Sequence, residues 1–377
     1  MSDLSPTEQP LRAAMIGGGV NSAAGRVHEI AMRMDGKFEL VAGCFSRHAE
    51  SNGDSGRVYG VAPDRVYPSS EALLNAERGR VDVIVIAAPS NVHAQLIHAA
   101  LDRDYTVITD KPTVATVSEA EALLERLGPE TDRLFTIFNY TGYPAVREMK
   151  RVIGEGEIGT VFKLMIEMPQ DSFLRMKNTG SAGAVQDWRL HDDEICGLSL
   201  DLFTHIHSLA LFLTGAHPVN AWASMRSISQ LSPGLIDEVD AIVEYDSGMV
   251  MNAWFGKAAL GYRNGLRVRA FGTRGSLEWE QMNPEIILHA DSTGDLHIID
   301  RVSPRSKIAC QQRYNRFKGG HPAGFIEAFA NYYSDISDGI KTGRCSPHLF
   351  SLQSVAEGVA WAERIQASGD IKLQAPP

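Results

Sequence analysis

The chain has 377 residues, of which 44% are hydrophobic and 22% are charged, and its formal net charge is -10. This composition is ordinary for a globular protein, and the length favours two domains over one. The negative balance argues against a nucleic-acid partner, which needs a basic face to meet phosphate, and against docking on anionic lipid.

Cysteine usage and the N-terminus indicate the compartment. The four cysteines, Cys44, Cys196, Cys310 and Cys345, lie far apart, so the spacing of a zinc site or a disulfide framework is absent. The first ten residues are polar, and no apolar run reaches membrane-spanning length. We therefore expect a cytoplasmic protein with no membrane segment and no metal site.

The chain opens with a strand that leads into a glycine turn. Residues 12–19 pass from an apolar stretch into three glycines, and a segment of helical periodicity follows. Strand, glycine turn and helix form the context of a dinucleotide site, where N–H groups at a helix N-terminus meet a pyrophosphate. We expect Gly17 and Gly19 in the first two positions of the Gly-x-Gly-x-x-Gly fingerprint, and Ser22 in the third.

The second strand, residues 38–45, ends without the carboxylate that an NAD-preferring site carries to hold the ribose. Ser46 and Arg47 follow it instead. Because Arg47 can stack on adenine and pair with a 2′-phosphate, we expect NADP(H) to be favoured over NAD(H). The alternative is that Arg47 is an ordinary loop residue and that Ser46 holds the 2′-hydroxyl.

Strands and helices continue to alternate through the first half. This alternation predicts a doubly wound parallel sheet, a Rossmann fold, with right-handed crossovers. Ligands bind beyond the carboxyl ends of such strands. We expect further strands at residues 81–87, 105–109 and 134–140, and helices at 69–76, 94–103 and 118–127, the last capped by Ser118.

Turns at the carboxyl edge supply the remaining candidate cofactor contacts. Pro89, Asn91 and His93 lie in one turn, and Asp110 and Lys111 end the next strand. The proline after Lys111 lacks a backbone donor and fixes φ, so the chain must turn there. An ammonium on such a rigid corner can polarise a substrate hydroxyl or exchange protons with it. The alternative is a solvated surface lysine.

After residue 141 the pattern changes to strands separated mostly by turns, which predicts a large, mainly antiparallel sheet in an α+β domain. Helices can cover one of its faces, and such an open sheet suits a homo-oligomer, a dimer or a tetramer. We expect a Rossmann domain at residues 1–140 and a substrate-binding and oligomerisation domain at 141–377. The second domain should begin with a helix at 144–154, and its covering helices should lie near 196–214, 322–340 and 348–368. Its expected strands are 221–226, 239–245, 249–256, 266–271, 276–280, 286–289 and 296–299.

A second polar cluster lies on an otherwise apolar helix. Asp201 and His205 are four residues apart and therefore share a helix face. Such groups are costly to bury unless they are paired or useful, and an imidazole can accept a hydroxyl proton near neutral pH. Alternatively, Asp201 satisfies a core histidine, or the pair joins His207 around a metal ion. Residues two apart on a helix point in different directions, so His205 and His207 make a poor chelate.

Four polar residues are candidates to line a substrate pocket, because they lie on or after segments that lead to the same crevice. One of them, Trp188, can stack on the apolar face of a sugar ring or can simply be a core residue. The four are Tyr140, Gln170, Trp188 and Arg189.

Together these pieces resemble the Gfo/Idh/MocA family, typified by glucose–fructose oxidoreductase and inositol dehydrogenases. The likeness covers nearly the whole chain. Its parts are the glycine turn, the turn at residues 89–93, Asp110-Lys111-Pro112 where the family usually has Glu-Lys-Pro, and the Asp201-x-x-x-His205 helix.

The resemblance implies an NAD(P)-dependent dehydrogenase that acts on a secondary alcohol or hemiacetal carbon of a sugar, inositol or related cyclic polyol. It implies that Lys111, Asp201 and His205 form the catalytic trio. His205 would take the hydroxyl proton, Lys111 would lower the pKa of that hydroxyl, and Asp201 would orient the substrate or the other two groups.

One departure from the family pattern bears on the pocket, and two alternative functions remain open. Phe203 stands where the family usually has glycine, and we expect its ring to narrow the substrate pocket. A glycosidase that oxidises its sugar transiently, eliminates the aglycone and reduces the ring again would use the same cofactor. A member that senses a ligand without catalysis would keep the fold and lack turnover.

Overall fold

The computed structural model describes residues 9–180 and 190–372. The chain divides into two compact units, Met1–Gly142 with Phe325–Ala356 and Tyr143–Gly324 with Glu357–Pro377. The expected boundary after residue 140 lies beside the break after Gly142. Residues 325–356, which we expected in the second domain, instead group with the first unit.

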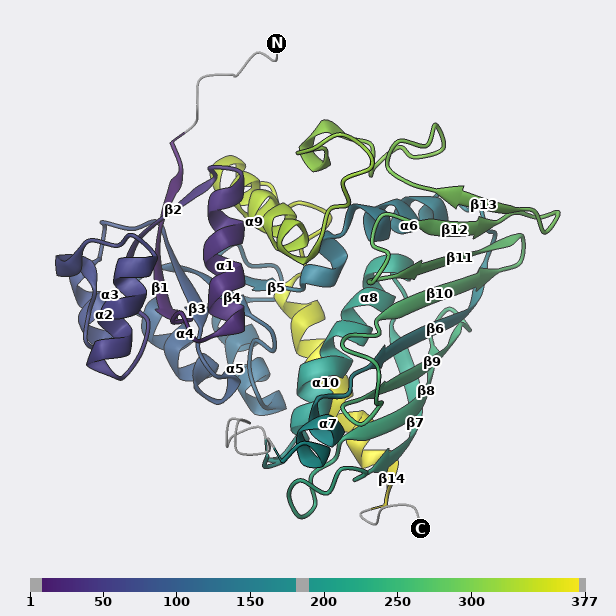
Figure 1. The fold of residues 1–377 in the computed structure, drawn as a ribbon, viewed down its shortest axis with the longest axis horizontal. Coiled ribbons are helices and arrows are strands. Elements are labelled where there is room, and N and C mark those ends of the chain that lie inside the picture. The colour runs from purple at the N-terminus through teal and green to yellow at the C-terminus, as the bar shows by residue number, and fades with distance from the viewer. Residues whose placement is uncertain (1–8, 181–189, 373–377) are drawn as a thin grey trace. The chain divides into compact units, whose positions relative to one another are not determined.

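The first unit contains a parallel sheet whose five described strands run in the order β2-β1-β3-β4-β5 (Figure 1). All five residues of β3 are buried, so both faces of the sheet are covered, as an unbroken apolar strand predicts. The strands are β1 (Leu11–Gly17), β2 (Phe38–Cys44), β3 (Val83–Ala87), β4 (Thr106–Asp110) and β5 (Leu134–Ile137).

Helices alternate with these strands and confirm the Rossmann architecture. The N-cap of α5 is Thr116, which forms a capping box with Glu119, and not Ser118 as we expected. The helices of this unit are α1 (Ala23–Met34), α2 (Ala49–Val58), α3 (Ser70–Ala76), α4 (His93–Leu101), α5 (Val117–Leu127) and α9 (Phe325–Thr342), with short 3₁₀ turns η1 (Pro63–Arg65), η2 (Ser90–Val92) and η3 (Asn139–Gly142).

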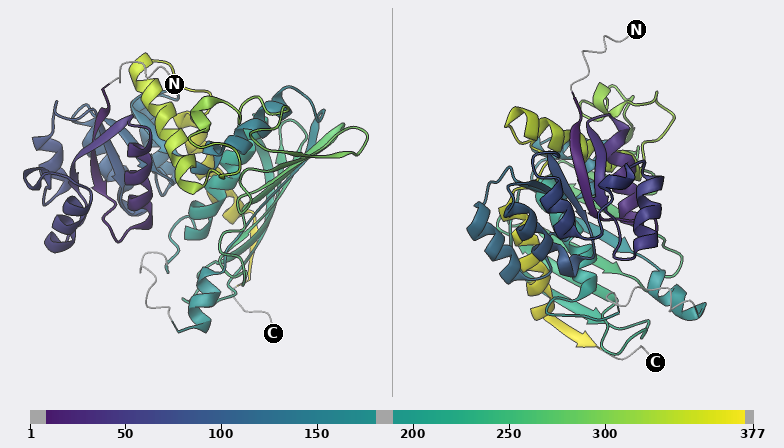
Figure 2. Two further views of the ribbon diagram at one scale, coloured as in Figure 1. Left: turned by 45° about the horizontal axis from the view of Figure 1, so that its top comes forward. Right: turned by 90° about the vertical axis from the view of Figure 1, so that its left-hand side faces the viewer.

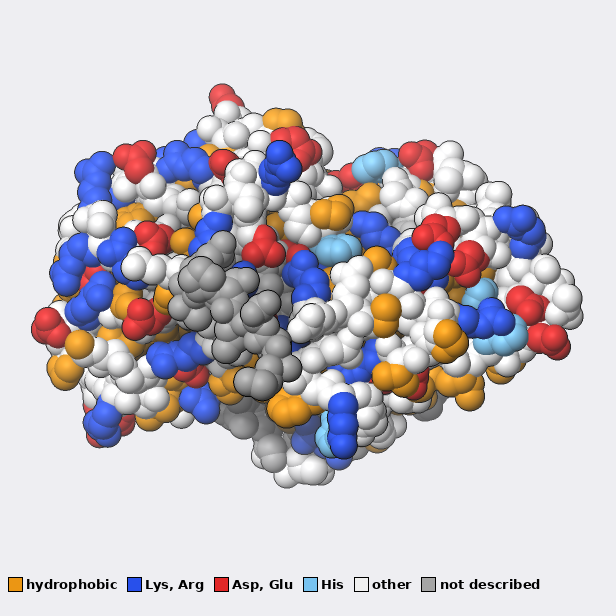
Figure 3. Space-filling view, turned by 90° about the horizontal axis from the view of Figure 1, so that it is seen from above, with side chains coloured by type: hydrophobic (Ala, Val, Ile, Leu, Met, Phe, Trp, Pro, Cys, Tyr) orange, Lys and Arg blue, Asp and Glu red, His pale blue; other side chains and the backbone are white. Residues whose placement is uncertain are grey.

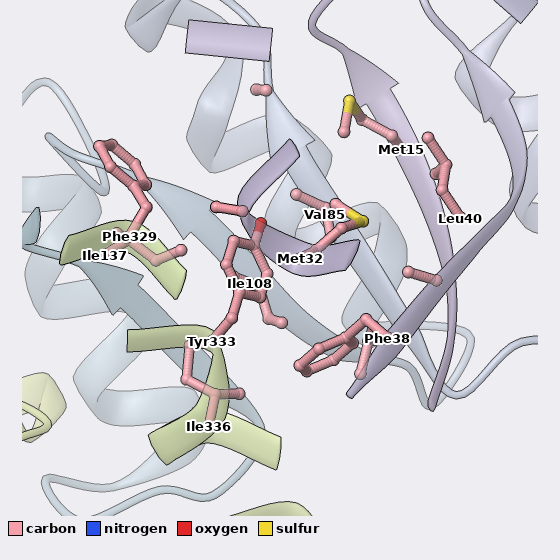
Figure 4. Packing of buried hydrophobic residues seen from close by; sticks show 14 of the residues in the cluster. Met15, Met32, Phe38, Leu40, Val85, Ile108, Ile137, Phe329, Tyr333 and Ile336 are labelled. Carbon is pink, nitrogen blue, oxygen red and sulfur yellow. The ribbon is translucent and has the colours of Figure 1, made fainter. Parts of the chain in front are cut away.

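Helix α9 packs against α1 and against the parallel sheet, although it comes from the far end of the sequence. We expected a helix near residues 322–340 to cover the antiparallel sheet, and that assignment is wrong. Phe329, Tyr333 and Ile336 of α9 join one buried cluster with Met32 of α1 and with strand residues such as Val85 (Figure 4). The burial of these large side chains attaches the late helix firmly to the first sheet.

The second unit contains a sheet of nine described strands in the order β13-β12-β11-β10-β6-β9-β8-β7-β14. Its neighbours are antiparallel except for two parallel pairs, β6 with β9 and β7 with β14. The strands are β6 (Val161–Pro169), β7 (Pro218–Arg226), β8 (Glu238–Tyr245), β9 (Val250–Gly256), β10 (Arg267–Gly272), β11 (Gly275–Glu280), β12 (Ile287–Ala290), β13 (Leu296–Ile299) and β14 (Gly369–Lys372).

Helices cover one face of this sheet, as predicted, and leave the other face open (Figure 2). On the open face Trp222 and Ile242 are direct cross-strand partners, 49% and 45% exposed respectively. The helical elements are α6 (Pro144–Gly154), α7 (Ser172–Asn178), the π-helical segment η6 (Ser199–Phe203), α8 (Thr204–Thr214), the 3₁₀ turn η7 (Gln312–Tyr314) and α10 (Leu352–Ala367), the last of which begins in the first unit and ends in the second.

The surface carries both signs of charge. Figure 3 shows acidic and basic side chains interspersed over the face that it presents, without one broad basic field. In the part of the chain that the structure describes, we find no helix with both the length and the apolarity needed to cross a membrane.

Candidate functional site

The glycine turn after β1 has a backbone that only glycine can adopt there. Gly17 and Gly18 have φ values of +78° and +68°. A Cβ atom on Gly17 would lie 2.8 Å from the carbonyl oxygen of Ala87 at the end of β3. The turn is therefore both left-handed and pressed against its neighbour strand, which leaves bare backbone at the N-terminus of α1.

At the start of α1, Ser22, which we expected in the third fingerprint position, caps the helix, and another residue provides the close packing. Ser22 is the N-cap, and its hydroxyl accepts a hydrogen bond of 3.2 Å from the N–H of Gly25. Close packing of the helix on the turn belongs to Gly25, because a Cβ atom there would lie 2.0 Å from the carbonyl oxygen of Gly18. Gly25 therefore has the packing function of the third fingerprint position.

Polar side chains of α2 hold the turn and the end of β2 in place. The Ser55 hydroxyl accepts from the N–H of Val20 at 3.1 Å. The side-chain oxygen of Asn52 accepts from the N–H groups of Phe45 and Ser46, at 2.7 and 3.3 Å. Sequence reasoning missed both residues, although buried Ser and Asn within a helix signal bonds to neighbouring backbone.

A hollow of about 980 Å³ opens beyond the end of β2. Ser46, Arg47 and Arg57 are among the residues that line it, and none of the described lining residues is acidic. Arg47 is exposed, and the Ser46 hydroxyl accepts from the N–H of His48 at 3.1 Å. The hollow thus has the position and the positive charge to receive a phosphate-bearing end of a nucleotide.

The turn after β3 holds three predicted cofactor residues in different environments. Pro89 and Asn91 are exposed at the edge of the sheet. His93 is only 1% exposed, and its two ring nitrogens lie 2.8 Å from the carbonyl oxygens of Ala88 and Pro112. The ring of His93 therefore joins the loops after β3 and β4 instead of facing solvent.

Asp110, the last residue of β4, belongs to a buried polar chain. Its Oδ1 accepts from the N–H of Lys111 at 2.9 Å, and its Oδ2 lies 3.7 Å from Nε2 of His28. The other nitrogen of His28 is 2.8 Å from the hydroxyl of Tyr333 on α9. At 3.7 Å, Asp110 and His28 are too far apart for a formed hydrogen bond.

Charges around Asp110 favour its ionised form. Burial alone would raise the pKa of this carboxyl group, but attraction by His28, Lys111 and His93 outweighs it, and the pKa is lowered. The same carboxylate adds to the effect of burial in raising the pKa of Tyr333. Lys111 is half-buried at the corner, and its peptide bond to Pro112 is cis. A carboxylate thus lies directly beside the predicted catalytic lysine in the sequence.

In the second unit, Asp201 is paired with a lysine that sequence reasoning did not single out. The ammonium of Lys257 donates to Oδ2 of Asp201 at 2.6 Å. Asp201 lies on the π-helical segment η6, while His205 is in the first turn of α8. Single π-helical turns are frequent at functional sites.

Asp201 and its neighbours differ in how much of each side chain is exposed to solvent. Asp201 keeps 26% of its side chain exposed, whereas His205 is 4% exposed. Phe203 is 1% exposed, and its ring lies 5.9 Å from that of Phe255 on β9. We expected Phe203 to narrow the substrate pocket, but the structure places its ring in the core.

The other substrate candidates differ in their positions. Gln170 follows β6, and its backbone bonds to Gly256 and Ala259 beside Lys257. Tyr140 lies in η3 of the first unit and is 5% exposed, so it is a core residue in this structure. Trp188 and Arg189 lie outside the described residues.

Among the residues that the structure describes, no three His, Cys, Asp or Glu side chains cluster closely enough to hold a metal ion. His207, the alternative ligand, is 2% exposed. It lies 3.9 Å from the carboxylate of Glu357 on α10.

Comparison with known proteins agrees with this geometry. Residues 11–138 match the oxidoreductase family with an NAD-binding Rossmann fold, and residues 146–278 match the GFO/IDH/MocA C-terminal domain. The chain belongs to the Gfo/Idh/MocA family.

Among the relatives, an uncharacterized oxidoreductase of Bacillus subtilis, YfiI, is 28% identical over 96% of this chain and 95% of its own. Inositol 2-dehydrogenase of Rhizobium meliloti is 25% identical over 76% of this chain and 79% of its own. A solved inositol dehydrogenase homologue from Azotobacter vinelandii, in complex with NAD+, is 25% identical over 96% of this chain and 95% of its own, with a TM-score of 0.86. This family member is accordingly an oxidoreductase with an NAD-binding domain.

The described residues fit a dinucleotide cofactor. The left-handed glycine turn excludes side chains at Gly17, and α1 begins directly after the turn with Ser22 as its cap. The cationic hollow at Ser46 and Arg47 lies at the end of the neighbouring strand β2. Pyrophosphate at a helix N-terminus and ribose at the second strand is the arrangement that this fold uses.

Proposed function

We propose that this family member is an NAD(P)-dependent dehydrogenase for a secondary alcohol or hemiacetal carbon of a sugar, inositol or related cyclic polyol. The observation that carries the proposal is that one chain contains both an intact nucleotide turn, in the first unit, and an acidic and imidazole pair, Asp201 and His205, in the second. Relatives named for inositol, levoglucosan and D-apiose support the substrate class.

We assign three catalytic roles on this basis. Lys111, fixed between β4 and Pro112, polarises the substrate hydroxyl and lowers its pKa. His205 takes the hydroxyl proton as the carbon is oxidised. Asp201 orients the substrate through a hydroxyl group. In the reverse direction His205 returns the proton to the new alkoxide.

NAD(P), when bound, supplies the acceptor or donor of the hydride. Gly17 and Gly19 would hold its pyrophosphate, because the N–H groups at the start of α1 favour negative charge there. Pro89, Asn91 and Asp110 lie along the same edge of the sheet and complete the proposed contacts. His93 supports that edge through the two carbonyl groups that its ring joins.

We propose further that the cofactor is NADP(H) rather than NAD(H). Arg47 and Ser46 line an opening without an acidic residue among its described lining, so a 2′-phosphate would meet a cation and a hydroxyl there. An acidic residue, which would hold the two ribose hydroxyls of NAD and repel that phosphate, is missing from the same lining.

The open face of the second sheet suits self-association as a dimer or tetramer. Trp222 and Ile242 form an exposed apolar pair at its surface. Sedimentation of the wild type and of Trp222→Lys/Ile242→Lys checks this part: a smaller particle for the variant supports it, and an unchanged particle contradicts it.

The central experiment is a turnover assay. Purified protein is incubated with NADP+ or NAD+ and a panel of inositols, aldoses and anhydrosugars, and the reduced cofactor is followed at 340 nm. General acid–base groups contribute about 10²- to 10⁴-fold, so we expect Lys111→Met and His205→Asn to reduce kcat/KM by that order. Cofactor binding, measured by fluorescence, remains within about threefold in His205→Asn, because His205 contacts substrate only.

Turnover that is absent with every substrate, in protein that binds cofactor tightly, would refute the dehydrogenase proposal. A chromogenic glycoside cleaved without net cofactor reduction would redirect it to the glycosidase chemistry. Full activity in Lys111→Met would remove the lysine from the mechanism.

A further inference from the structure

We infer that Lys257 is a positioning residue that fixes the charge and the orientation of Asp201 in the active site. The inference rests on the proposed function, because it assigns a partner to a carboxylate that we place in catalysis. Its starting observation is the 2.6 Å contact between Nζ of Lys257 and Oδ2 of Asp201.

The ammonium of Lys257 is buried to an extent that demands partners. The side chain is 7% exposed, against 26% for Asp201. A lysine at this depth is costly to ionise unless an opposite charge compensates for the lost water. The ring of Phe173 on α7 lies 5.0 Å from the same ammonium and adds a cation–π contact. The more exposed member of the pair, Asp201, is therefore the one that a substrate can reach.

The main chain around Lys257 is held on two sides. Its N–H donates to the carbonyl oxygen of Asp237 at 2.8 Å, and its own carbonyl oxygen accepts from the N–H of Phe173 at 2.9 Å. Asp237 is itself fully buried, and its carboxylate accepts from the N–H groups of Ile228 and Ser229, each at 2.7 Å. The base of the lysine side chain is thus attached to a fixed part of the sheet.

The residue before Lys257 admits no side chain. A Cβ atom on Gly256 would lie 2.0 Å from a carboxylate oxygen of Glu238 and 2.9 Å from the carbonyl oxygen of Asp237. β9 therefore ends in close contact with β8, and the lysine leaves the sheet at a defined point. Phe255, one residue earlier, packs on Phe203 of the π-helical segment. The end of β9 thus contacts the segment that carries Asp201 in two ways: Phe255 packs on Phe203, and Lys257 pairs with Asp201.

The neighbourhood is that of a site and not of a solvated surface pair. Gln170, a candidate substrate contact, bonds through its N–H to Gly256 and through its carbonyl group to Ala259, on either side of Lys257. His205 follows Asp201 by four residues. An ammonium 2.6 Å from Asp201 contributes to the electric field at this imidazole and fixes the direction in which the carboxylate points. Misplacement of a reacting group by about 1 Å can cost roughly a hundredfold in rate.

The test compares Lys257→Met with Lys163→Met. Lys163 is a matched control, because it lies on β6, donates to Asn252 on β9 at 2.5 Å, and is far along the same two strands from Gly256. We expect kcat/KM of Lys257→Met to fall about ten- to a hundredfold, mostly in kcat, whereas Lys163→Met stays within about twofold. We also expect the acidic limb of the kcat/KM profile to move in Lys257→Met, and Lys257→Arg to restore part of the rate because it keeps the buried charge.

A second measurement is independent of turnover. The ring resonances of His205 are followed by NMR against pH in the wild type, in Lys257→Met and in Lys257→Arg. Removal of the cation takes one positive charge away from the Asp201 carboxylate, so the midpoint for His205 rises in Lys257→Met and returns toward the wild-type value in Lys257→Arg.

The outcomes separate this inference from the proposed function. If the wild type oxidises no substrate of the panel but the His205 midpoint shifts as stated, the dehydrogenase proposal fails while the positioning role of Lys257 stands. If Lys257→Met folds, retains the wild-type kcat/KM and leaves the His205 titration unchanged, the positioning role is overturned. If Lys257→Met does not fold, Lys257→Arg decides: a His205 midpoint near the wild-type value together with a substantial part of the wild-type kcat supports the role, and a loss of kcat equal to that of His205→Asn overturns it.

Discussion

Gly25 of α1 lies directly against Gly18 of the glycine turn, so that a single added methyl group on Gly25 would overlap the carbonyl group of Gly18. This contact fixes the distance between the first strand and the first helix. It also explains why a serine is acceptable three residues earlier, where the chain needs a cap and has room for a side chain.

We predict that Gly25→Ala destabilises the first unit by about 1–3 kcal/mol, because an overpacked contact must move backbone atoms. NADP+ binding weakens in parallel, since the displaced turn is the proposed pyrophosphate site. The matched control is Gly53→Ala in α2, where an added Cβ meets no atom within 4 Å, and which should stabilise the helix by about 0.5–1 kcal/mol. Thermal unfolding compares the two variants, and a fluorescence titration of Gly25→Ala with NADP+ measures the effect on binding. Equal stability of the two variants would contradict the packing role of Gly25.

Arg47→Ala should separate the two cofactors. We expect NADP+ affinity to fall about ten- to a hundredfold, as for the loss of one charge-assisted hydrogen bond, while NAD+ affinity changes little. Arg57→Ala is the control, because Arg57 lines the same hollow but is paired with Asp54 at 2.6 Å. Isothermal titration gives both constants. An equal loss for NAD+ and NADP+ in Arg47→Ala would show that Arg47 does not read the 2′-phosphate.

The chain from Asp110 through His28 to Tyr333 should behave as one coupled unit. Tyr333→Phe keeps the packed ring and removes a hydrogen bond of 2.8 Å, at a cost of about 1 kcal/mol in the free energy of unfolding. His28→Leu costs more, about 1–3 kcal/mol, because it leaves the Tyr333 hydroxyl without its partner. The double variant should lose less than the sum of the two, by at least about 0.5 kcal/mol. Urea unfolding of the four proteins measures the cycle, and strict additivity would refute the coupling.

The buried ring of His207 predicts a loss of stability in acid. Burial first, and the nearby His217 second, lower the pKa of His207 from its usual value to about 4. The folded state therefore favours the neutral ring, and stability is complete above the unfolded pKa near 6.5 and falls as the pH drops toward 4. At pH 5 this single group accounts for roughly 2 kcal/mol of lost stability.

The variant His207→Leu isolates that contribution. Its free energy of unfolding should fall less than that of the wild type between pH 7.5 and pH 5. In contrast, His217→Gln removes only the smaller of the two causes, at a side chain that is 54% exposed, and should lose nearly as much stability as the wild type. Urea titrations at the two pH values provide the comparison. Parallel losses in the wild type and in His207→Leu would assign the acid sensitivity to other groups.

Much of the fold was predictable from local pattern. The helix expected at residues 144–154 has the observed bounds of α6, because a proline at its first position and a regular apolar stripe mark it clearly. The apolar run that ends at Ala87 reads as a buried strand, and all of β3 is buried. These elements carry their own signals and need no tertiary context.

Other elements lack such signals. Helix α2 contains two glycines, two serines and an asparagine, and it is stabilised by bonds from Asn52 and Ser55 to backbone outside the helix. The central strand β6 does alternate at Leu164, Ile166 and Met168, so its period of two could have revealed it.

The candidate site likewise contains residues that local motifs predict and contacts that they do not predict. Lys111, Asp201 and His205 were chosen from motifs, but the link from Asp201 to Lys257 spans 56 residues and exists only because β9 ends beside the π-helical segment. No spacing rule predicts such a pair. Likewise, the role of His93 as a tie between two loops depends on where β3 and β4 end relative to each other.

The position of α9 bears on the order in which the protein forms during its synthesis. All five described strands of the parallel sheet have been synthesised by residue 137, yet the cover of one apolar face of the sheet is completed only by Phe329, Tyr333 and Ile336 of α9. A ribosome must add nearly two hundred more residues before that cover emerges. The nascent nucleotide domain therefore exposes apolar surface throughout translation of the second sheet. A truncated protein that ends near residue 140 should accordingly aggregate instead of forming an isolated domain.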